Sequence, residues 1–126
     1  MVMTHSGHFL GVARTLLGRS DAAYQAYIKN GKVFLYAKIL KESNDALREL
    51  LINNAHLLPM EHARNALALI HHIDVWGAIW EDTYQASQPG LMSVFAFENV
   101  VNFPRKEVEM LMDYYKEINP ERPSCA

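Results

Sequence analysis

The chain has 126 residues, of which 50% are hydrophobic, 21% charged and 10% aromatic. This length fits a single domain, and the apolar fraction is sufficient for a hydrophobic core without support from a disulfide or a metal. With 12 basic and 14 acidic residues the net charge is −2, so the chain lacks the basic excess that binds nucleic acid or an anionic membrane. We expect one domain over residues 1–126 that ends in a Pro-containing tail, residues 119–126.

The cysteine content and the hydropathy of the chain indicate which cellular compartment it occupies. Cys125 is the only cysteine, which excludes an intramolecular disulfide and a cysteine-based zinc site and fits a reducing cytoplasm. The longest nearly apolar run, Ala66 to Trp80, has 15 residues and contains charged and polar side chains. A bilayer requires about 20 apolar residues, so we expect no membrane-spanning helix.

The first part of the chain predicts two short helices. Apolar residues recur at helical spacing over residues 9–17, and Gly18 is expected to end that helix. Ser20 is expected to cap a second helix over residues 21–29. The dipeptide Asn30-Gly31 either ends this helix in a left-handed turn or joins two strands in a hairpin, and the alanine-rich sequence before it favours the helix.

Residues 32–57 predict a long amphipathic helix. Apolar side chains recur in steps of three and four, which places them on one face of a helix. The sequence Ser43-Asn44-Asp45 could cap a new helix near Ala46, so a break or a kink is allowed at that point.

The central segment, from about Pro59 to Ala86, predicts a helix that is apolar on nearly every side. Proline in the first turn, with Glu61 beside the positive end of the helix dipole, favours a start here. The sequence Gln88-Pro89-Gly90 predicts a turn after it. A helix that is apolar all round is normally buried, either in the centre of a bundle or between subunits.

The remaining chain predicts two further elements. Residues 91–103 are mostly apolar and predict a short buried helix, although their β-branched and aromatic residues also suit a strand. Pro104 begins a last helix that ends near Ile118 and carries its apolar side chains on one face. We therefore expect an all-α bundle of five to six helices, packed around the central helix.

Three polar residues interrupt the central apolar helix: His71, His72 and Asp74. His71 and Asp74 are three residues apart and can touch on a helix. The carboxylate would then orient one imidazole nitrogen and leave the other free as a base or a metal ligand. The more common situation is that such groups satisfy one another inside the core.

Further residues could complete a binding site around this cluster. Trp76 and Trp80 are one helical turn apart and could form a wall for a flat ligand, although such a stripe is usually core or interface. Glu98 lies in an apolar run, where burial would raise the pKa of its carboxyl group, although such a glutamate more often faces solvent from one edge of a helix. The candidate ligand-binding set is therefore His71, His72, Asp74, Trp76, Trp80 and Glu98.

The sequence contains no motif that indicates an enzyme or a cofactor. It lacks the paired Glu-x-x-His motifs of di-iron bundles, the zinc-protease motif His-Glu-x-x-His and the glycine-rich phosphate loops. We therefore assign no catalytic residue, no metal ligand and no cofactor, and an enzyme is the less favoured class.

Composition favours a function in protein–protein interaction. Six methionines and several neighbouring aromatic residues supply apolar surface that a small domain has difficulty in hiding. Because two-fold dimers are the commonest assemblies, we expect a cytoplasmic homodimer that acts as a regulatory or adaptor module, with another protein as its partner. The alternative is a helical-bundle binder of a metal or small ligand, or an enzyme, centred on His71, His72 and Asp74.

Overall fold

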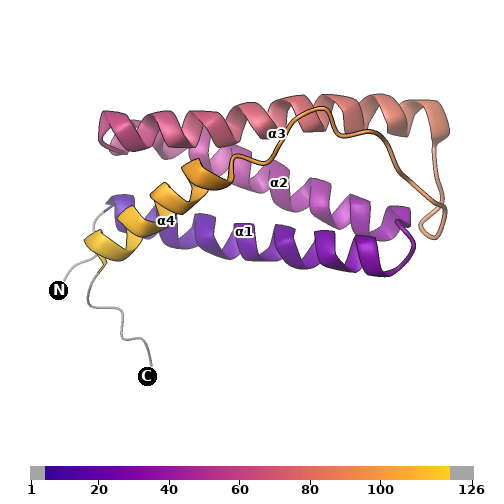
Figure 1. Ribbon diagram of the computed structural model, residues 1–126, viewed down its shortest axis with the longest axis horizontal. Helices are drawn as coiled ribbons and strands as arrows, with labels where there is room; N and C mark the ends of the chain where they lie inside the picture. The colour runs from indigo at the N-terminus through magenta and orange to yellow at the C-terminus, as the bar shows by residue number, and fades with distance from the viewer. Residues whose placement is uncertain (1–4, 120–126) are drawn as a thin grey trace, which may run out of the picture.

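The computed structural model describes residues 5–119 and folds them into four α-helices without a β-strand (Figure 1). The helices are α1 (His5–Lys29), α2 (Phe34–Asn54), α3 (Met60–Ser87) and α4 (Arg105–Ile118), with a 3₁₀ turn, η1 (Ala55–Leu57), before α3. The expected all-α class is confirmed, whereas the expected number of five to six helices is wrong. Except for Asn119, the predicted tail with Cys125 lies outside the described residues.

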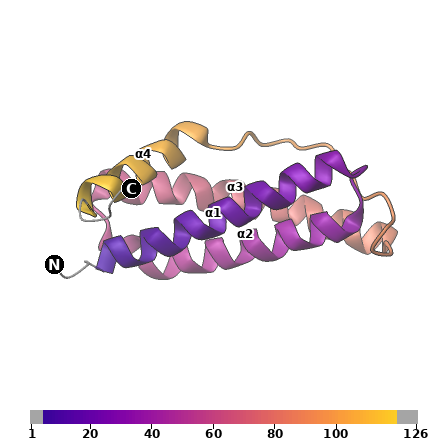
Figure 2. The same cartoon turned by 90° about the horizontal axis from the view of Figure 1, so that it is seen from below.

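The three long helices run side by side in an up-down-up order (Figures 1 and 2). Residues 88–104, which we call the return segment, then run back along the bundle beside α3. They lead to α4, which packs on α1 and α3 at the end of the bundle where α1 begins. The chain therefore crosses the bundle a fourth time, but mostly as irregular backbone.

Residues 9–29 lie in one continuous helix instead of the two short helices expected. Gly18 and Ser20 are both inside α1, and the Ser20 hydroxyl does not cap a helix. Its Oγ lies 2.8 Å from Ser43 Oγ and 2.7 Å from Asn44 Oδ1, so it is used in a contact with α2. The expectation failed because this tertiary contact replaces the local capping bond that a serine otherwise favours.

The Asn30-Gly31 dipeptide joins two helices and not two strands. Gly31 has φ +79°, and the Lys32 N–H donates to the Tyr27 carbonyl at 2.8 Å. This bond spans six residues and is the hallmark of a helix end with a left-handed residue after it. The helical alternative for this turn is therefore correct.

Helix α2 continues through Ser43 without the break that the sequence allowed. Ser43 is buried, and its Oγ donates to the carbonyl of Leu16 on α1 at 3.0 Å. A serine whose hydroxyl is bound to a neighbouring helix has no reason to compete with its own backbone. The predicted seam is present in part: Ser43 and Leu47 are buried and Leu50 is partly buried, but Leu57 is exposed, and the buried Leu51 lies outside the predicted seam.

Helix α3 agrees with the predicted central helix, but it is not buried on every side. Leu69, Ile73 and Trp76 face the core, whereas Leu67 and His71 are exposed. The sequence predicted complete burial because apolar residues surround the helix. In the structure α1, α2, the return segment and α4 leave the outer side of α3 open to solvent.

The return segment is not the short buried helix expected over residues 91–103. From Val94 onward its side chains alternate, with Phe95 and Phe97 turned inward and Val94 and Ala96 outward. This period of two is typical of extended backbone, which the β-branched and aromatic residues favour. It pairs with the bundle at one isolated bridge, Val33 with Val94, and so forms no sheet within residues 5–119.

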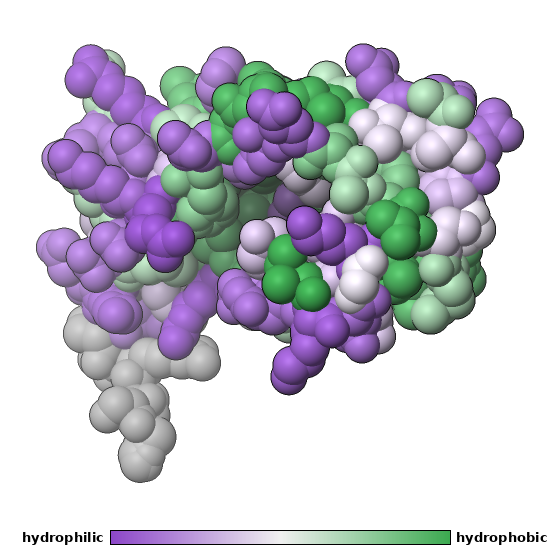
Figure 3. All heavy atoms as spheres, turned by 45° about the vertical axis from the view of Figure 1, so that its right-hand side comes forward, coloured by the Kyte–Doolittle hydropathy of each residue, from purple (hydrophilic) through white to green (hydrophobic). Residues whose placement is uncertain are grey.

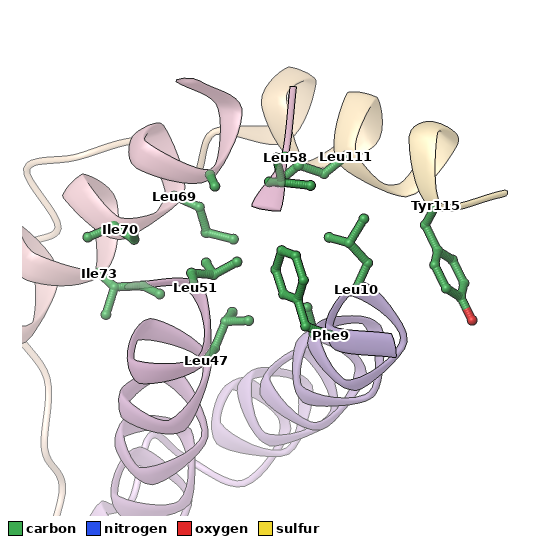
Figure 4. Close-up of a cluster of buried hydrophobic side chains, with 12 residues drawn as sticks. Phe9, Leu10, Leu47, Leu51, Leu58, Leu69, Ile70, Ile73, Leu111 and Tyr115 are labelled. Carbon is green, nitrogen blue, oxygen red and sulfur yellow. The ribbon is translucent and has the colours of Figure 1, made fainter. Parts of the chain in front are cut away.

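Two clusters of buried side chains stabilise the bundle. The larger one brings together residues from all four helices, among them Phe9, Leu10, Leu47, Leu69 and Leu111 (Figure 4). The smaller one contains Phe34, Ala37, Trp76, Trp80 and Phe95, so an anchor from the return segment is part of the core. None of the described helices is long and apolar enough to cross a membrane.

Candidate functional site

A groove of about 440 Å³ lies where α1, α2 and α3 meet the return segment and the start of α4. Small molecules bind in pockets of about 300–1,000 Å³ with mainly apolar walls. The volume of this groove falls in that range. Its apolar lining comes from several elements and comprises Leu17, Leu40, Leu47, Leu69, Ile73, Trp76 and Phe103.

His72 supplies a polar atom to the α3 wall of the groove. Its Nδ1 is buried and has no hydrogen-bond partner of standard geometry among the described residues. Burial lowers the pKa of His72 from its ordinary value of 6.5; the nearby backbone of Asn102 acts in the opposite direction, and His71 lowers the pKa further. The ring is therefore neutral at pH 7.

The polar contacts of Ser20 form the edge of the groove between α1 and α2. Ser20 and Asn44 both line the groove, and their side chains are in hydrogen-bond contact. Ser43 lies behind them and fixes Ser20 by a second contact. This edge is rigid because each helix supplies polar partners to the other.

The first half of the return segment is fixed by hydrogen bonds. The N–H groups of Phe34 and Leu35 donate to the carbonyls of Ser93 and Leu91 at 2.8 and 2.7 Å, which satisfies the otherwise free amides at the start of α2. The Phe95 N–H donates to the Lys32 carbonyl at 2.9 Å, and the Tyr27 hydroxyl donates to the Phe95 carbonyl. Burial, and then Tyr24, raise the pKa of Tyr27, which keeps this hydroxyl protonated as a donor.

The second half of the return segment, residues 96–104, has fewer hydrogen bonds and is held by the packing of Phe97 and Val101 against the smaller core. The backbone of Asn102 lies beside the His72 ring, and the carbonyls of Phe103 and Pro104 accept from Arg105 and Val108 of α4. A second hollow of about 170 Å³ shares Tyr24, Leu40, Trp76 and Asn99 with the groove. The space beneath this half is therefore incompletely filled on both sides of Asn99.

Two charged side chains of opposite sign stand at the rim of the groove. Asp21 comes from α1 and Arg105 is the first residue of α4. Neither forms an ion pair with another described residue. Both are exposed, so they remain available to a polar group of a bound molecule.

The structure separates the three polar residues that the sequence grouped together. His72 faces the groove, but His71 is exposed, and the exposed Asp74 forms an ion pair with Arg48 of α2. The predicted contact between His71 and Asp74 is therefore wrong. Arg48, which lies 26 positions away in the sequence, takes the place of His71 as the partner of the carboxylate.

The other candidate residues also have different surroundings. Trp76 lines the groove, as a ligand wall requires. Trp80 belongs to the smaller core cluster, where its Nε1–H donates to the Ala37 carbonyl at 3.2 Å. Glu98 is exposed on the outer side of the return segment and does not line the groove.

Sequence reasoning missed several residues of the groove. Asn99, Phe103 and Arg105 reach it only because the return segment crosses back over α3, and no local pattern indicates that path. Ser20 was interpreted as a helix cap. The apolar run with alternating aromatic residues at 95 and 97 was the signal that could have indicated an extended segment.

Metal binding receives no support from the arrangement of acidic residues and histidines. Within the described part of the chain, no three residues of the types His, Cys, Asp and Glu are grouped so that they could hold a metal ion. His72 and Asp21 line the same groove but have no third such residue beside them.

Comparisons of the chain with protein-family models, with curated proteins and with solved structures give no match. The functional inference consequently depends on the groove and on the exposed surface, each of which can be tested directly.

Proposed function

We propose that the chain is a binding protein for a small organic molecule that occupies the groove between α1, α2, α3 and the return segment. The observation that carries this proposal is a groove of about 440 Å³ with apolar walls, lined also by His72, whose buried Nδ1 has no hydrogen-bond partner of standard geometry in the described chain. An unsatisfied buried polar group is unfavourable, so a ligand that supplies the hydrogen bond gains affinity at this point.

The lining indicates the chemistry of the ligand. Leu40, Leu69 and Trp76 would contact an apolar or flat aromatic body. Nδ1 of His72 would pair with a hydrogen-bonding group of that body, while Asp21 and Arg105 at the rim accept polar substituents of either charge. The proposal is binding and not catalysis, because it requires no reacting group.

Binding of the fluorescent probe 1-anilinonaphthalene-8-sulfonate tests this proposal. The wild type should bind the probe saturably, with one site per chain. Gln25→Trp places a bulky side chain on an exposed rim residue of the groove and should weaken binding at least about tenfold, a loss of about 1.4 kcal/mol. Ala22→Trp is the matched control, since it adds the same side chain to an exposed residue of α1 outside the groove lining.

The outcomes of this experiment are distinct. The probe should be excited directly, so that the added tryptophans do not contribute to its signal, and circular dichroism should confirm the helical content of each variant. Absence of saturable binding by the folded wild type, or equal binding by Gln25→Trp and Ala22→Trp, contradicts the proposal. Native mass spectrometry of the tag-free protein would also reveal a molecule that stays bound during purification.

We propose, as a second function, that the chain is an interaction module that associates as a homodimer or with another protein. The observation that favours it is the outer side of the return segment, where four large apolar side chains are exposed: Leu91 by 51%, Met92 by 72%, Val94 by 71% and Val100 by 65%. Figure 3 shows hydrophobic residues in several areas of one face, among hydrophilic ones. Exposed apolar groups of this kind favour contact with another chain.

Light scattering after size-exclusion chromatography tests this second function. A dimer should give twice the chain mass of 14.4 kDa, and the double variant Val94→Glu with Val100→Glu should give the monomer mass. Glu98→Lys changes an exposed residue between these two positions and should leave the mass unchanged. A wild type that is monomeric at every concentration contradicts the homodimer.

A further inference from the structure

We propose that residues 96–104 form a gate over the groove, which the neutral ring of His72 holds closed through Phe103 and which opens when His72 takes up a proton. This proposal concerns the regulation of the same groove and rests on the proposed binding function, because a gate is useful only if the groove receives a ligand.

The two ends of the gate are fixed by hydrogen bonds, whereas its middle is held by the packing of Phe97 and Val101 against the smaller core. At one end, Phe95 is buried in the smaller core and both its N–H and its carbonyl are hydrogen-bonded. At the other end, Pro104 leads directly into α4, which packs on the larger core through Leu111 and Tyr115. Between residues 96 and 102 the described chain shows no backbone–backbone hydrogen bond to a helix, and the backbone of Asn102 lies beside His72; next to α4, the carbonyls of Phe103 and Pro104 accept from the N–H groups of Arg105 and Val108 at 2.8 and 3.0 Å. A stretch with few such bonds opens at low energetic cost.

His72 contacts the last part of the gate. Its ring meets the ring of Phe103 edge to face, with centroids 5.5 Å apart and planes at 87°. Phe103 is itself 45% exposed, and its carbonyl accepts from the N–H of Arg105 on α4. The backbone of Asn102 lies beside the same imidazole. One side chain of α3 thus contacts two successive residues of the gate.

Protonation of His72 disfavours the closed position. In the imidazolium both ring nitrogens carry a hydrogen and positive charge is placed at the buried Nδ1; the backbone of Asn102 favours this charged form, but burial of the ring outweighs it. The pKa of His72 in the closed form is lowered, chiefly by burial. Because the closed form binds the proton more weakly than a ring in water, proton uptake must shift the equilibrium towards an open form that exposes the ring.

Charged groups on the neighbouring elements leave this effect in place. Asp21 on α1 and Arg105 at the start of α4 line the groove with opposite charges, and neither is among the causes of the lowered pKa of His72. On α3 itself, His71 disfavours the proton. The lining residues from α2 are uncharged. Burial is the largest influence on this pKa.

Quenching of Trp76 fluorescence by acrylamide measures the gate without any ligand. Trp76 lines the groove and packs against Phe97 of the gate, so opening exposes its indole. Trp80→Phe leaves Trp76 as the only tryptophan. Quenching should rise at least about twofold between pH about 7.5 and pH about 5, a range in which histidines titrate. Acrylamide is uncharged, so its own quenching strength does not change over this range.

Three variants in the Trp80→Phe background decide the mechanism. His72→Phe keeps a ring against Phe103 but cannot take up a proton, so quenching should stay low at both pH values. His71→Asn changes the exposed neighbouring histidine and should retain the full pH response. Phe103→Ala removes the contact with His72 and should give strong quenching at both pH values.

Three results would contradict the gate proposal. The first is a quenching constant of the folded Trp80→Phe protein that does not change with pH. The others are a pH-dependent change in quenching that persists in His72→Phe and one that is lost in His71→Asn. Quenching that falls on acidification would show that protonation closes the segment, which also contradicts the proposal. Circular dichroism at both pH values separates gate opening from unfolding. Because the quenching requires no ligand, the gate and the proposed binding function fail separately: the probe titration decides the latter.

Discussion

His72 on α3 and Phe103 in the return segment meet edge to face, with ring centroids 5.5 Å apart. The two residues are far apart in the chain, and this contact closes one side of the groove. It brings together a titratable ring whose Nδ1 has no partner in the described chain and a segment that has few other bonds. The stability of the bundle and the shape of its groove should therefore both depend on the protonation of a single histidine.

The stability of the protein should fall as the pH drops below 6.5. The pKa of His72 is lowered from 6.5 in the folded state, so between the two pKa values the unfolded chain binds the proton and the folded chain does not. The contribution of His72 to the free energy of unfolding is therefore fully present above pH 6.5. It is lost progressively as the pH falls towards the pKa of His72 in the folded state. Urea unfolding at several pH values measures this slope. In His72→Phe the slope should be smaller, and an unchanged slope would assign it to other groups.

Ser43→Ala should destabilise the protein by about 1 kcal/mol, the usual net value of one hydrogen bond. Ser43 is buried, and its Oγ donates to the Leu16 carbonyl at 3.0 Å, which joins α2 to α1. Ser87→Ala provides the control, because Ser87 is exposed and its hydroxyl bonds only to Thr83 within the same helix. Urea unfolding of both variants should show a loss for Ser43→Ala alone, and equal values would exclude a special role for this contact.

Phe95→Ala should destabilise the protein by about 3–5 kcal/mol, as expected when a buried phenylalanine is truncated. Phe95 is 2% exposed and contacts Phe34 and Trp80 in the smaller core. Val94→Ala, at the adjacent and exposed position, should change stability by less than about 0.5 kcal/mol. A small effect of Phe95→Ala in thermal or urea unfolding would show that the anchored half of the return segment is not part of the cooperative core.

Asp74→Asn should have only a small effect on stability. Its carboxylate pairs with Arg48 between α3 and α2, but both side chains are more than one-third exposed, and water screens such pairs. Asp74→Asn should therefore lower the thermal unfolding midpoint only slightly, and high salt should reduce the difference further. A large loss that salt does not affect would indicate instead that Asp74 is part of a buried polar network, as the sequence suggested.

Much of the fold could be predicted from local patterns. The helices from Phe34 to Asn54, from Met60 to Ser87 and from Arg105 to Ile118 follow from apolar periodicity, and the last two also from the proline just before their starts, because these features act over a few residues. The turn at Gly31 was predicted with its alternative. The continuity of α1 through Ser20 was not, since its hydroxyl contacts Asn44 on another helix.

The candidate site was predictable only in part. Spacing along α3 correctly drew attention to His72 and Trp76, which both line the groove. Spacing alone could not show that His71 and Asp74 face solvent. Apolar residues occur on nearly every side of α3, so the sequence does not indicate which side faces the core. The elements that pack against α3 decide which of its sides are buried.

The sequence by itself determined the all-α class, the position of the central helix and the polar interruption within it. These depend on backbone hydrogen bonds and side-chain spacing within one segment, which are local interactions. Only the tertiary structure decided that residues 91–103 return across the bundle in extended form, that Arg48 pairs with Asp74, and that Phe103 covers His72. Each of these depends on contacts between segments distant in the chain, and such contacts can override local propensity because burial and pairing contribute more free energy than the preference of a single residue.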